Sequence, residues 1–169
     1  GLTFKEYEGN PVVKHQGRDP RLLWHEPTNQ FVMAVYDESE GKQWIAFYIS
    51  PDLKKWTFTS KIEGYYECPE LFSLKAGGEG PEKWILYAAD GEYVIGEFNG
   101  REFKPETKKQ RLWYGNFYAS QTISNEPKGR RIQIGWARGI DPKSEVFNQQ
   151  MNVPVELSLQ KSDKSYRLH

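Results

Sequence analysis

A chain of 169 residues with 37% hydrophobic and 27% charged residues has the composition of one ordinary globular domain, neither disordered nor membrane-embedded. The 23 lysine and arginine residues balance 23 aspartate and glutamate residues, so we expect no nucleic-acid partner and no anionic membrane partner. One cysteine and three scattered histidines supply neither an internal disulfide nor a metal site, and we expect no cofactor.

The chain opens with residues 1–17, which carry no regular strand pattern. Four short strand-like runs follow, separated by turns that contain Pro, Asn, Asp or Gly. These runs cover residues 18–24, 31–37, 44–50 and 56–60. Four such strands in succession predict an antiparallel meander, and we expect residues 1–17 to be the tail of a preceding unit.

The same pattern recurs twice, with runs at 67–74, 83–89, 92–98 and 101–106, and then at 117–123, 131–137, 153–159 and 165–169. A period of about 50 residues is typical of propeller blades. The sequence therefore predicts an all-β domain over 1–169, with about three four-stranded antiparallel blades, roughly at 18–66, 67–110 and 111–169.

Three blades are too few for a closed ring, which typically needs four to eight. We therefore expect an incomplete ring, as in a fragment of a longer protein. Two alternatives stay open: the units form a sandwich, or copies self-associate through exposed blade faces and edges.

Two carboxylates stand at the start of innermost strands, Asp19 in GRDP and Glu67 in YECPE. Each is followed by a proline within two residues, so we treat the two positions as equivalent and expect both to face one central pocket. Two such acids can cleave a glycosidic bond, with one protonated and the other ionised. The alternative is that they are solvated or paired with an arginine such as Arg18.

The ordered motifs GRDPRLLWHEP, FYISPDLKKWTF, YYECPELFSL, KWILYAADGEYVIGEF, YGNFYASQTISNEPKGRRIQIGWARG and FNQQMNVPVELSL resemble glycoside hydrolase family 32. This is the levanase, inulinase and invertase group, and the resemblance covers essentially the whole chain. It implies a five-bladed β-propeller that hydrolyses β-fructofuranosyl bonds of levan, inulin or sucrose with retention of configuration and without a metal.

The resemblance also implies roles for single residues. Glu67 matches the general acid/base, and Asp19 matches the acid that stabilises the transition state. Sugar contacts are implied for Arg18, Cys68, Tyr118 and Trp136. For Cys68 we favour a small packed side chain over a nucleophile, since no histidine stands near it in the sequence. An inward-facing aromatic such as Trp136 also has the alternative of simple core packing.

The nucleophile of this family lies in an Asn-Asp-Pro motif upstream of Arg-Asp-Pro, and residues 1–169 contain no such motif. We interpret Asp141, in GIDPK, as a turn residue. The chain is therefore expected to be inactive alone. A family 43-like arabinan or xylan hydrolase and a non-catalytic fructan-binding module remain as alternatives.

Three lesser expectations complete the sequence analysis. Glu70 is expected to hydrogen-bond locally, and His25 to lie in a loop. Kinship with exported fructan hydrolases suggests an extracytoplasmic location, which the sequence does not show directly.

Overall fold

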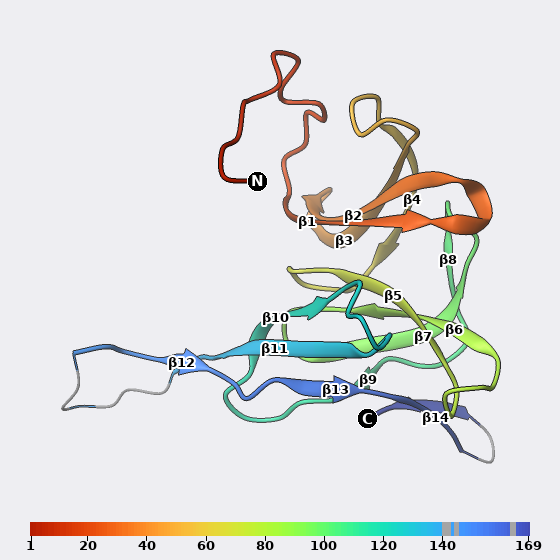
Figure 1. The fold of residues 1–169 in the computed structure, drawn as a ribbon, viewed down its shortest axis with the longest axis vertical. Helices are drawn as coiled ribbons and strands as arrows, with labels where there is room; N and C mark the ends of the chain where they lie inside the picture. Colours follow the sequence, from red (N-terminus) through yellow and green to blue (C-terminus); the bar gives the residue numbers. More distant parts are fainter. Residues whose placement is uncertain (140–142, 144–145, 163–164) are drawn as a thin grey trace.

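Strands make up almost all of the regular structure in the computed structural model, which describes residues 1–139, 143, 146–162 and 165–169 (Figure 1). The strands form three larger antiparallel sheets and a separate pair, and one 3₁₀ turn, η1 (Glu26–Thr28), interrupts them. The all-β prediction is confirmed.

The first sheet contains four strands in chain order: β1 (Arg18–His25), β2 (Gln30–Ser39), β3 (Lys42–Ser50) and β4 (Thr57–Glu63). A two-residue turn joins β2 to β3, and both of its residues, Glu40 and Gly41, have positive φ, at 57° and 68°. Such turns match the twist of a hairpin and fix its register, which here runs unbroken from Phe31 to Ser39.

The second sheet contains β5 (Glu70–Lys75), β6 (Glu82–Tyr87), β7 (Glu92–Phe98) and β8 (Phe103–Pro105), and β9 (Gln110–Arg111) pairs with the other end of β7. The outer strand of this sheet is thus broken in two. The break follows Pro105, where Glu106 and Thr107 both donate their backbone N–H to the carbonyl of Ile95. Two residues facing one partner interrupt the ladder as a bulge does.

The third sheet contains β10 (Tyr118–Ile123) and β11 (Arg131–Ala137), and both β12 (Gln150–Met151) and β13 (Val155–Leu157) pair with β11. The run predicted at 153–159 is broken at Ser158, which exchanges two backbone hydrogen bonds with His169. As a result, β14 (Leu159–Ser162) and β15 (Ser165–Leu168), which covers the predicted run at 165–169, form a pair of their own.

Two apolar clusters lie between successive sheets. The first joins the first and second sheets and includes Tyr36, Phe47, Leu86 and Phe98. The second joins the second sheet to the strands that follow it, through Ile85, Tyr93, Leu157 and Leu168 among others. Sheets stacked face to face in chain order are the arrangement of propeller blades.

The second strand of the first sheet, β2, is buried on both faces. Alternate residues such as Val32 and Tyr36 face the second sheet, while Met33 and Val35 face a smaller cluster that half-buried Val13 helps to cover. Residues 1–17 contain no strand. Their origin in a preceding blade stays a prediction, as do the predicted blade boundaries.

The described residues form blades of a β-propeller that do not close a ring, so the prediction of an incomplete propeller is confirmed. Within these residues, no helix has the length and apolar character needed to cross a membrane.

Candidate active site

The innermost strands begin with the same irregularity. β1 pairs with β2 at Arg18 and next at Arg21, and β10 pairs with β11 at Tyr118 and next at Gln121. The residue after each first pair, Asp19 or Ala119, has a left-handed backbone, with φ of 60° and 47°. In the second sheet, φ is positive at Glu67 (52°) and Cys68 (41°), directly before β5. Such strained residues re-aim side chains at strand ends.

This register corrects the expected equivalence of Asp19 and Glu67. Counted back from Pro20 and Pro69, Asp19 corresponds to Cys68, and Arg18 corresponds to Glu67. The backbone agrees, because Glu67 accepts a hydrogen bond from the N–H of Ala89, as expected for the first pair of that sheet. Glu67 is separated from its proline by Cys68, whereas Asp19 directly precedes its proline, so the two acids are one position out of step.

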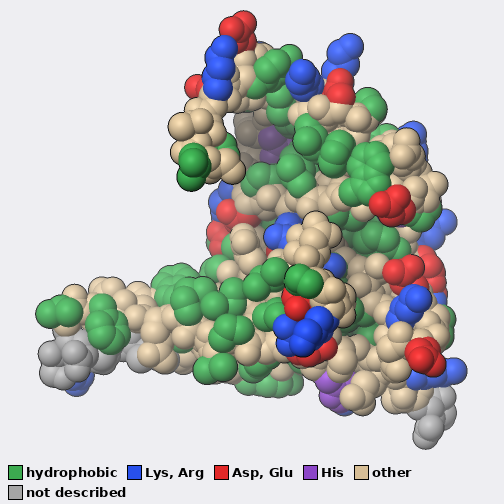
Figure 2. All heavy atoms as spheres, in the orientation of Figure 1, with side chains coloured by type: hydrophobic (Ala, Val, Ile, Leu, Met, Phe, Trp, Pro, Cys, Tyr) green, Lys and Arg blue, Asp and Glu red, His purple; other side chains and the backbone are tan. Residues whose placement is uncertain are grey.

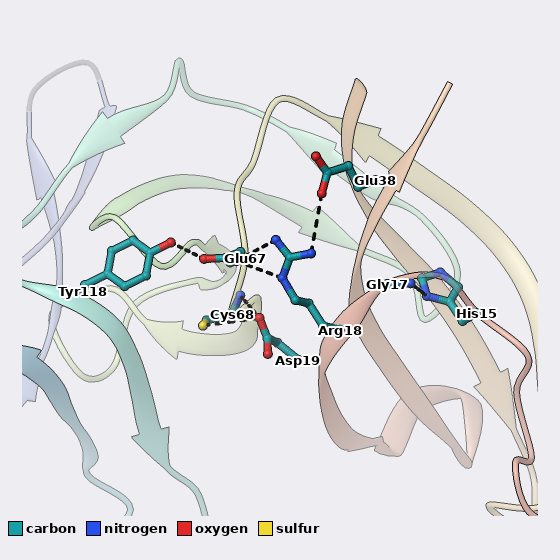
Figure 3. Close-up of polar contacts among 8 residues, drawn as sticks. All are labelled: His15, Gly17, Arg18, Asp19, Glu38, Glu67, Cys68 and Tyr118. Carbon is teal, nitrogen blue, oxygen red and sulfur yellow. Dashed lines mark hydrogen bonds and ion pairs between the residues drawn. The ribbon is translucent and has the colours of Figure 1, made fainter. Parts of the chain in front are cut away.

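Arg18, Glu67 and Tyr118 therefore form one layer across three sheets (Figure 3). Arg18 donates to Glu67 Oε1 from Nε at 2.8 Å and from Nη2 at 2.6 Å. The hydroxyl of Tyr118 donates to Glu67 Oε2. Each oxygen of the carboxylate is thus held by a different neighbouring sheet. Arg18 also lies 3.5 Å from Glu38, through Nη1 and Oε2.

Aromatic rings hold the guanidinium of Arg18 in place. It lies 4.6 Å from the ring centre of Tyr36 and 5.9 Å from that of Tyr66. The ring of Trp136 lies edge-on to Tyr118 at 6.2 Å. Trp136 therefore adjoins the layer through Tyr118, and Arg138 covers the same tyrosine at 4.2 Å.

The electrostatics of the layer favour an ionised Glu67. Burial disfavours the charged carboxylate, but the hydrogen bonds from Tyr118 and Arg18 outweigh burial and hold the pKa of Glu67 below its usual range. Burial and the bond to Glu67 together raise the pKa of Tyr118, while the bond to Glu67 raises the pKa of Arg18 despite desolvation. At neutral pH the layer contains a carboxylate, a phenol and a guanidinium.

Asp19 lies beside this layer and is bound by Cys68. The backbone N–H of Cys68 donates to Asp19 Oδ2 at 3.2 Å, and the thiol Sγ lies 3.6 Å from the same oxygen (Figure 3). Burial and the charge of Asp19 raise the pKa of the thiol to about 12. A protonated thiol is a donor and not a nucleophile, which favours the interpretation of Cys68 as a packed side chain.

A hollow of about 260 Å³ adjoins Asp19. Its walls come from β1, from the start of β5 and from the second half and end of β10, and they contain Asp19, Pro20, Arg21, Leu22, Cys68, Pro69, Glu70, Gln121 and Ser124. Asp19 and Cys68 face this hollow, whereas Glu67, Arg18, Tyr118 and Trp136 are not part of its wall. A second hollow of about 510 Å³ continues from Arg21 and Leu22 along β1, away from the layer.

A second polar layer, which the sequence motifs did not predict, surrounds Glu70. Glu70 is 1% exposed. The expectation that it hydrogen-bonds locally is wrong, because its partners are Arg21 on β1 and Thr122 on β10. One signal was available: Arg21 and Glu70 each follow a proline of an equivalent motif and have opposite charges. Across the described residues, no group of three or more His, Cys, Asp or Glu could hold a metal ion. Asp141 lies outside the described residues.

The chain is similar to known proteins both in sequence and in fold. A family profile described as "Glycosyl hydrolases family 32 N-terminal domain" matches residues 1–169. An extracellular exo-inulinase of Meyerozyma guilliermondii is 39% identical over 158 residues, which cover 81% of this chain and 30% of the relative. A levanbiose-producing levanase of Bacillus subtilis (strain 168) is 34% identical over 198 residues, which cover 99% of this chain and 37% of the relative.

Among solved structures, fructofuranosidase from Schwanniomyces occidentalis in complex with fructose superimposes with a TM-score of 0.82 at 27% identity. The match covers 99% of this chain and 38% of that one. The chain thus spans about a third of the length of the relatives that it matches.

Proposed function

Because the chain belongs to glycoside hydrolase family 32, we propose that it is part of an enzyme that hydrolyses β-fructofuranosyl bonds of levan, inulin or sucrose. One observation carries the proposal: Glu67 is held between Arg18 and Tyr118 from neighbouring sheets, next to Asp19 at the wall of a hollow. The names of the relatives supply the sugar class.

In this proposal Glu67 is the general acid/base. It gives a proton to the leaving oxygen and later takes one from the attacking water. Asp19 contacts sugar hydroxyls and stabilises the positive charge of the oxocarbenium-like transition state. The hydrogen bonds from Cys68 fix the direction of the Asp19 carboxylate before substrate binds.

Arg18 and Tyr118 then set the proton affinity of Glu67. With both oxygens bound, the carboxylate is ionised in the empty site, so its protonated form becomes more abundant as the pH falls. The first step needs this protonated form. We therefore infer that kcat/KM for the cleavage decreases as the pH rises above the pKa of Glu67.

The proposed mechanism retains configuration and needs a second carboxylate about 5–5.5 Å from the acid as nucleophile. Since residues 1–169 contain no Asn-Asp-Pro motif, we propose that they do not turn over substrate alone. The test compares this chain with a longer form that includes upstream sequence, using levan, inulin and sucrose. Turnover by the 169 residues that disappears in Glu67→Gln would contradict the proposed inactivity.

Product configuration, followed by NMR in the longer form, tests the reaction class. Retention supports the proposal. Inversion would contradict the retaining mechanism and favour the chemistry of the family 43-like alternative, in which the carboxyl groups stand about 6.5–9.5 Å apart and admit a water molecule.

A fructan-binding module without catalysis is the second candidate, since the polar residues around the hollow are present without the expected nucleophile motif. In that case titration calorimetry would show fructan binding that survives Glu67→Gln, while the longer form would have no Glu67-dependent turnover.

We also propose that the protein is exported, as the word "extracellular" in the name of the Meyerozyma relative suggests. Self-association is proposed from exposed hydrophobic side chains around β12. The chain around β12 extends away from the rest of the molecule (Figure 1), and Figure 2 shows hydrophobic side chains along this extension. The exposed hydrophobic residues of this segment are Val146, Phe147, Met151 and Val153. Light scattering tests this proposal, and a monodisperse monomer at all concentrations would contradict it.

A further inference from the structure

We propose that Glu70 is a positioning residue that sets the spacing of β1, β5 and β10 and thereby keeps Glu67 between Arg18 and Tyr118. The inference rests on the proposed role of Glu67 for its importance in catalysis. Its structural content, a dependence of the Glu67 environment on Glu70, does not require that role.

The two oxygens of Glu70 bind to different sheets. Oε1 lies 3.3 Å from Nε of Arg21 in the first sheet. Oε2 accepts a hydrogen bond from the hydroxyl of Thr122 in the third sheet. Glu70 itself is the first residue of β5 in the second sheet. One carboxylate therefore connects all three sheets.

The layer around Glu67 has the same construction. Its Oε1 binds Arg18 of the first sheet, and its Oε2 binds Tyr118 of the third. Two glutamates three residues apart thus connect the same three sheets, one on each side of Cys68, which has a positive φ. Any change in strand spacing at Glu70 is transmitted across only three residues to Glu67.

The layer around Glu70 also contains a direct contact between the first and third sheets. Nη2 of Arg21 donates to the backbone carbonyl of Thr122 at 2.6 Å. Arg131 donates from Nη1 to the Thr122 hydroxyl at 3.3 Å, and its guanidinium lies 5.0 Å from the ring centre of Phe72. Arg21, Glu70 and Thr122 are therefore tied in a ring of three contacts.

Burial makes this ring sensitive to geometry. Glu70 is 1% exposed and Thr122 is 3% exposed, so solvent screens their contacts only weakly. A buried charge is costly unless its hydrogen bonds are made, and removal of one partner leaves the others uncompensated. The exposed pair of Ser73 and Glu82 on the same sheet has no such restriction, because solvent screens it.

Apolar contacts alone already hold the sheets together, since two hydrophobic clusters lie between them. Hydrophobic packing is non-directional and tolerates small sliding movements, whereas hydrogen bonds restrict distance and angle. The geometry therefore assigns to Glu70 the role of fixing the position of the sheets relative to one another, more than that of holding them together.

The pKa of Glu67 in this chain gives a direct test, because it reports the bonds from Arg18 and Tyr118. Carbon-13 NMR follows the side-chain carboxyl of Glu67 through a pH titration, and the signal is assigned by its loss in Glu67→Gln. The variant is Glu70→Gln, which keeps the size of the side chain. Glu82→Gln is the matched control at an exposed position of the same sheet.

The sign of the change separates two explanations. If Glu70 acts by position, Glu70→Gln loosens the bonds to Glu67 and raises the pKa of Glu67 toward its usual value. Burial raises the pKa of Glu70 while that of Glu67 is lowered, so Glu70 takes up its proton before Glu67 as the pH falls. If Glu70 acts only by charge, Glu70→Gln therefore leaves the pKa of Glu67 unchanged, or lowers it by any negative charge that Glu70 still carries. A rise in Glu70→Gln with no change in Glu82→Gln supports the proposal, and an unchanged or lowered pKa overturns it.

A second pair of variants keeps the test decisive if Glu70→Gln fails to fold. Thr122→Val removes the hydroxyl that binds Glu70 but keeps the shape of the side chain, and Thr122→Ser keeps the hydroxyl. The proposal predicts a raised pKa of Glu67 in Thr122→Val and the wild-type value in Thr122→Ser. Equal values in these two variants overturn it.

This titration needs no turnover, so its outcome is independent of the proposed activity. A longer form in which Glu67→Gln retains full hydrolysis would refute the acid/base role and leave the positioning result standing. If the pKa of Glu67 in Glu70→Gln equalled that in the unaltered chain, the positioning role would be refuted and the hydrolase proposal would be unaffected.

Discussion

Gly17→Ala should displace Arg18 from Glu67 without touching either residue. A Cβ at position 17 would lie 1.7 Å from the backbone carbonyl oxygen of Tyr36. Real Cβ atoms essentially never come closer than 3.0 Å, so residue 17, which directly precedes β1, and Tyr36 of β2 must move apart by about 1.3 Å. Arg18, the next residue, pairs with Tyr36 in the sheet and would move with its strand.

A movement of this size exceeds the tolerance of the Arg18–Glu67 contacts. These bonds measure 2.6 and 2.8 Å, and an N–H···O bond beyond about 3.5 Å no longer contributes. We expect the pKa of Glu67 to rise toward its usual value, because one of the causes of its depression is lost. Forced overpacking should also lower the free energy of unfolding by about 1–3 kcal/mol.

Two measurements check this prediction: carbon-13 titration of Glu67 and urea denaturation. Gly9→Ala is the control, since the three atoms nearest its added methyl group all belong to the side chain of Tyr7, in an exposed segment. If Gly17→Ala matched Gly9→Ala in both the Glu67 titration and the unfolding free energy, the reasoning about β1 would be wrong.

Three further predictions concern the sheet interface and the pH response. Phe98→Ala should lower the unfolding free energy by about 3–5 kcal/mol in urea denaturation, because this buried ring packs between two sheets against Phe47 and Trp84; a loss below about 1 kcal/mol would contradict that packing. Burial lowers the pKa of His25 from 6.5, so the folded state binds a proton less readily than the unfolded state, and stability should fall as the pH drops below about 6.5. This loss should be absent in His25→Gln when both proteins are melted across the range, and an identical pH dependence would refute it. Tyr118→Phe should raise the pKa of Glu67 and, in an active longer form, move the high-pH decrease of kcat/KM to higher pH; an unmoved pH profile would show that the hydroxyl does not control Glu67.

Sequence patterns were sufficient for the inner strands of each sheet. Those strands recur at a regular spacing and are bounded by turn residues, so the repeat identifies them. The outer strands followed less well. The outer strands are interrupted where two consecutive backbone N–H groups donate to the carbonyl of Ile95, and where Ser158 and His169 exchange backbone hydrogen bonds. Neither feature has a clear sequence signal.

The candidate site was predictable as a set of motifs but not as a geometry. Arg18, Asp19, Glu67, Cys68 and Tyr118 do come together, and the sequence left pairing with Arg18 open as an alternative. The geometry of that pair follows from the bulge and from positive φ, which a sequence does not display. Contacts between distant residues were the hardest to foresee.

Glu70 and His25 illustrate this limit. Glu70 binds partners that lie 49 and 52 residues away in the chain, on two other sheets. His25 was expected in a loop but ends β1, where it is 3% exposed and packs against Trp84 and Phe98. Both side chains are polar, so local sequence favoured exposure, and only the stacking of the sheets buries them.

The most direct test of the central claim is the dependence of kcat/KM on the leaving group in Glu67→Ala, measured in a longer form with a complete site. Sucrose needs a proton on its leaving oxygen, whereas a nitrophenyl β-fructofuranoside leaves with little help. If Glu67 is the general acid, the variant should lose about 10²–10⁴-fold on sucrose and far less on the nitrophenyl substrate. An equal loss on both substrates would contradict the assignment of Glu67.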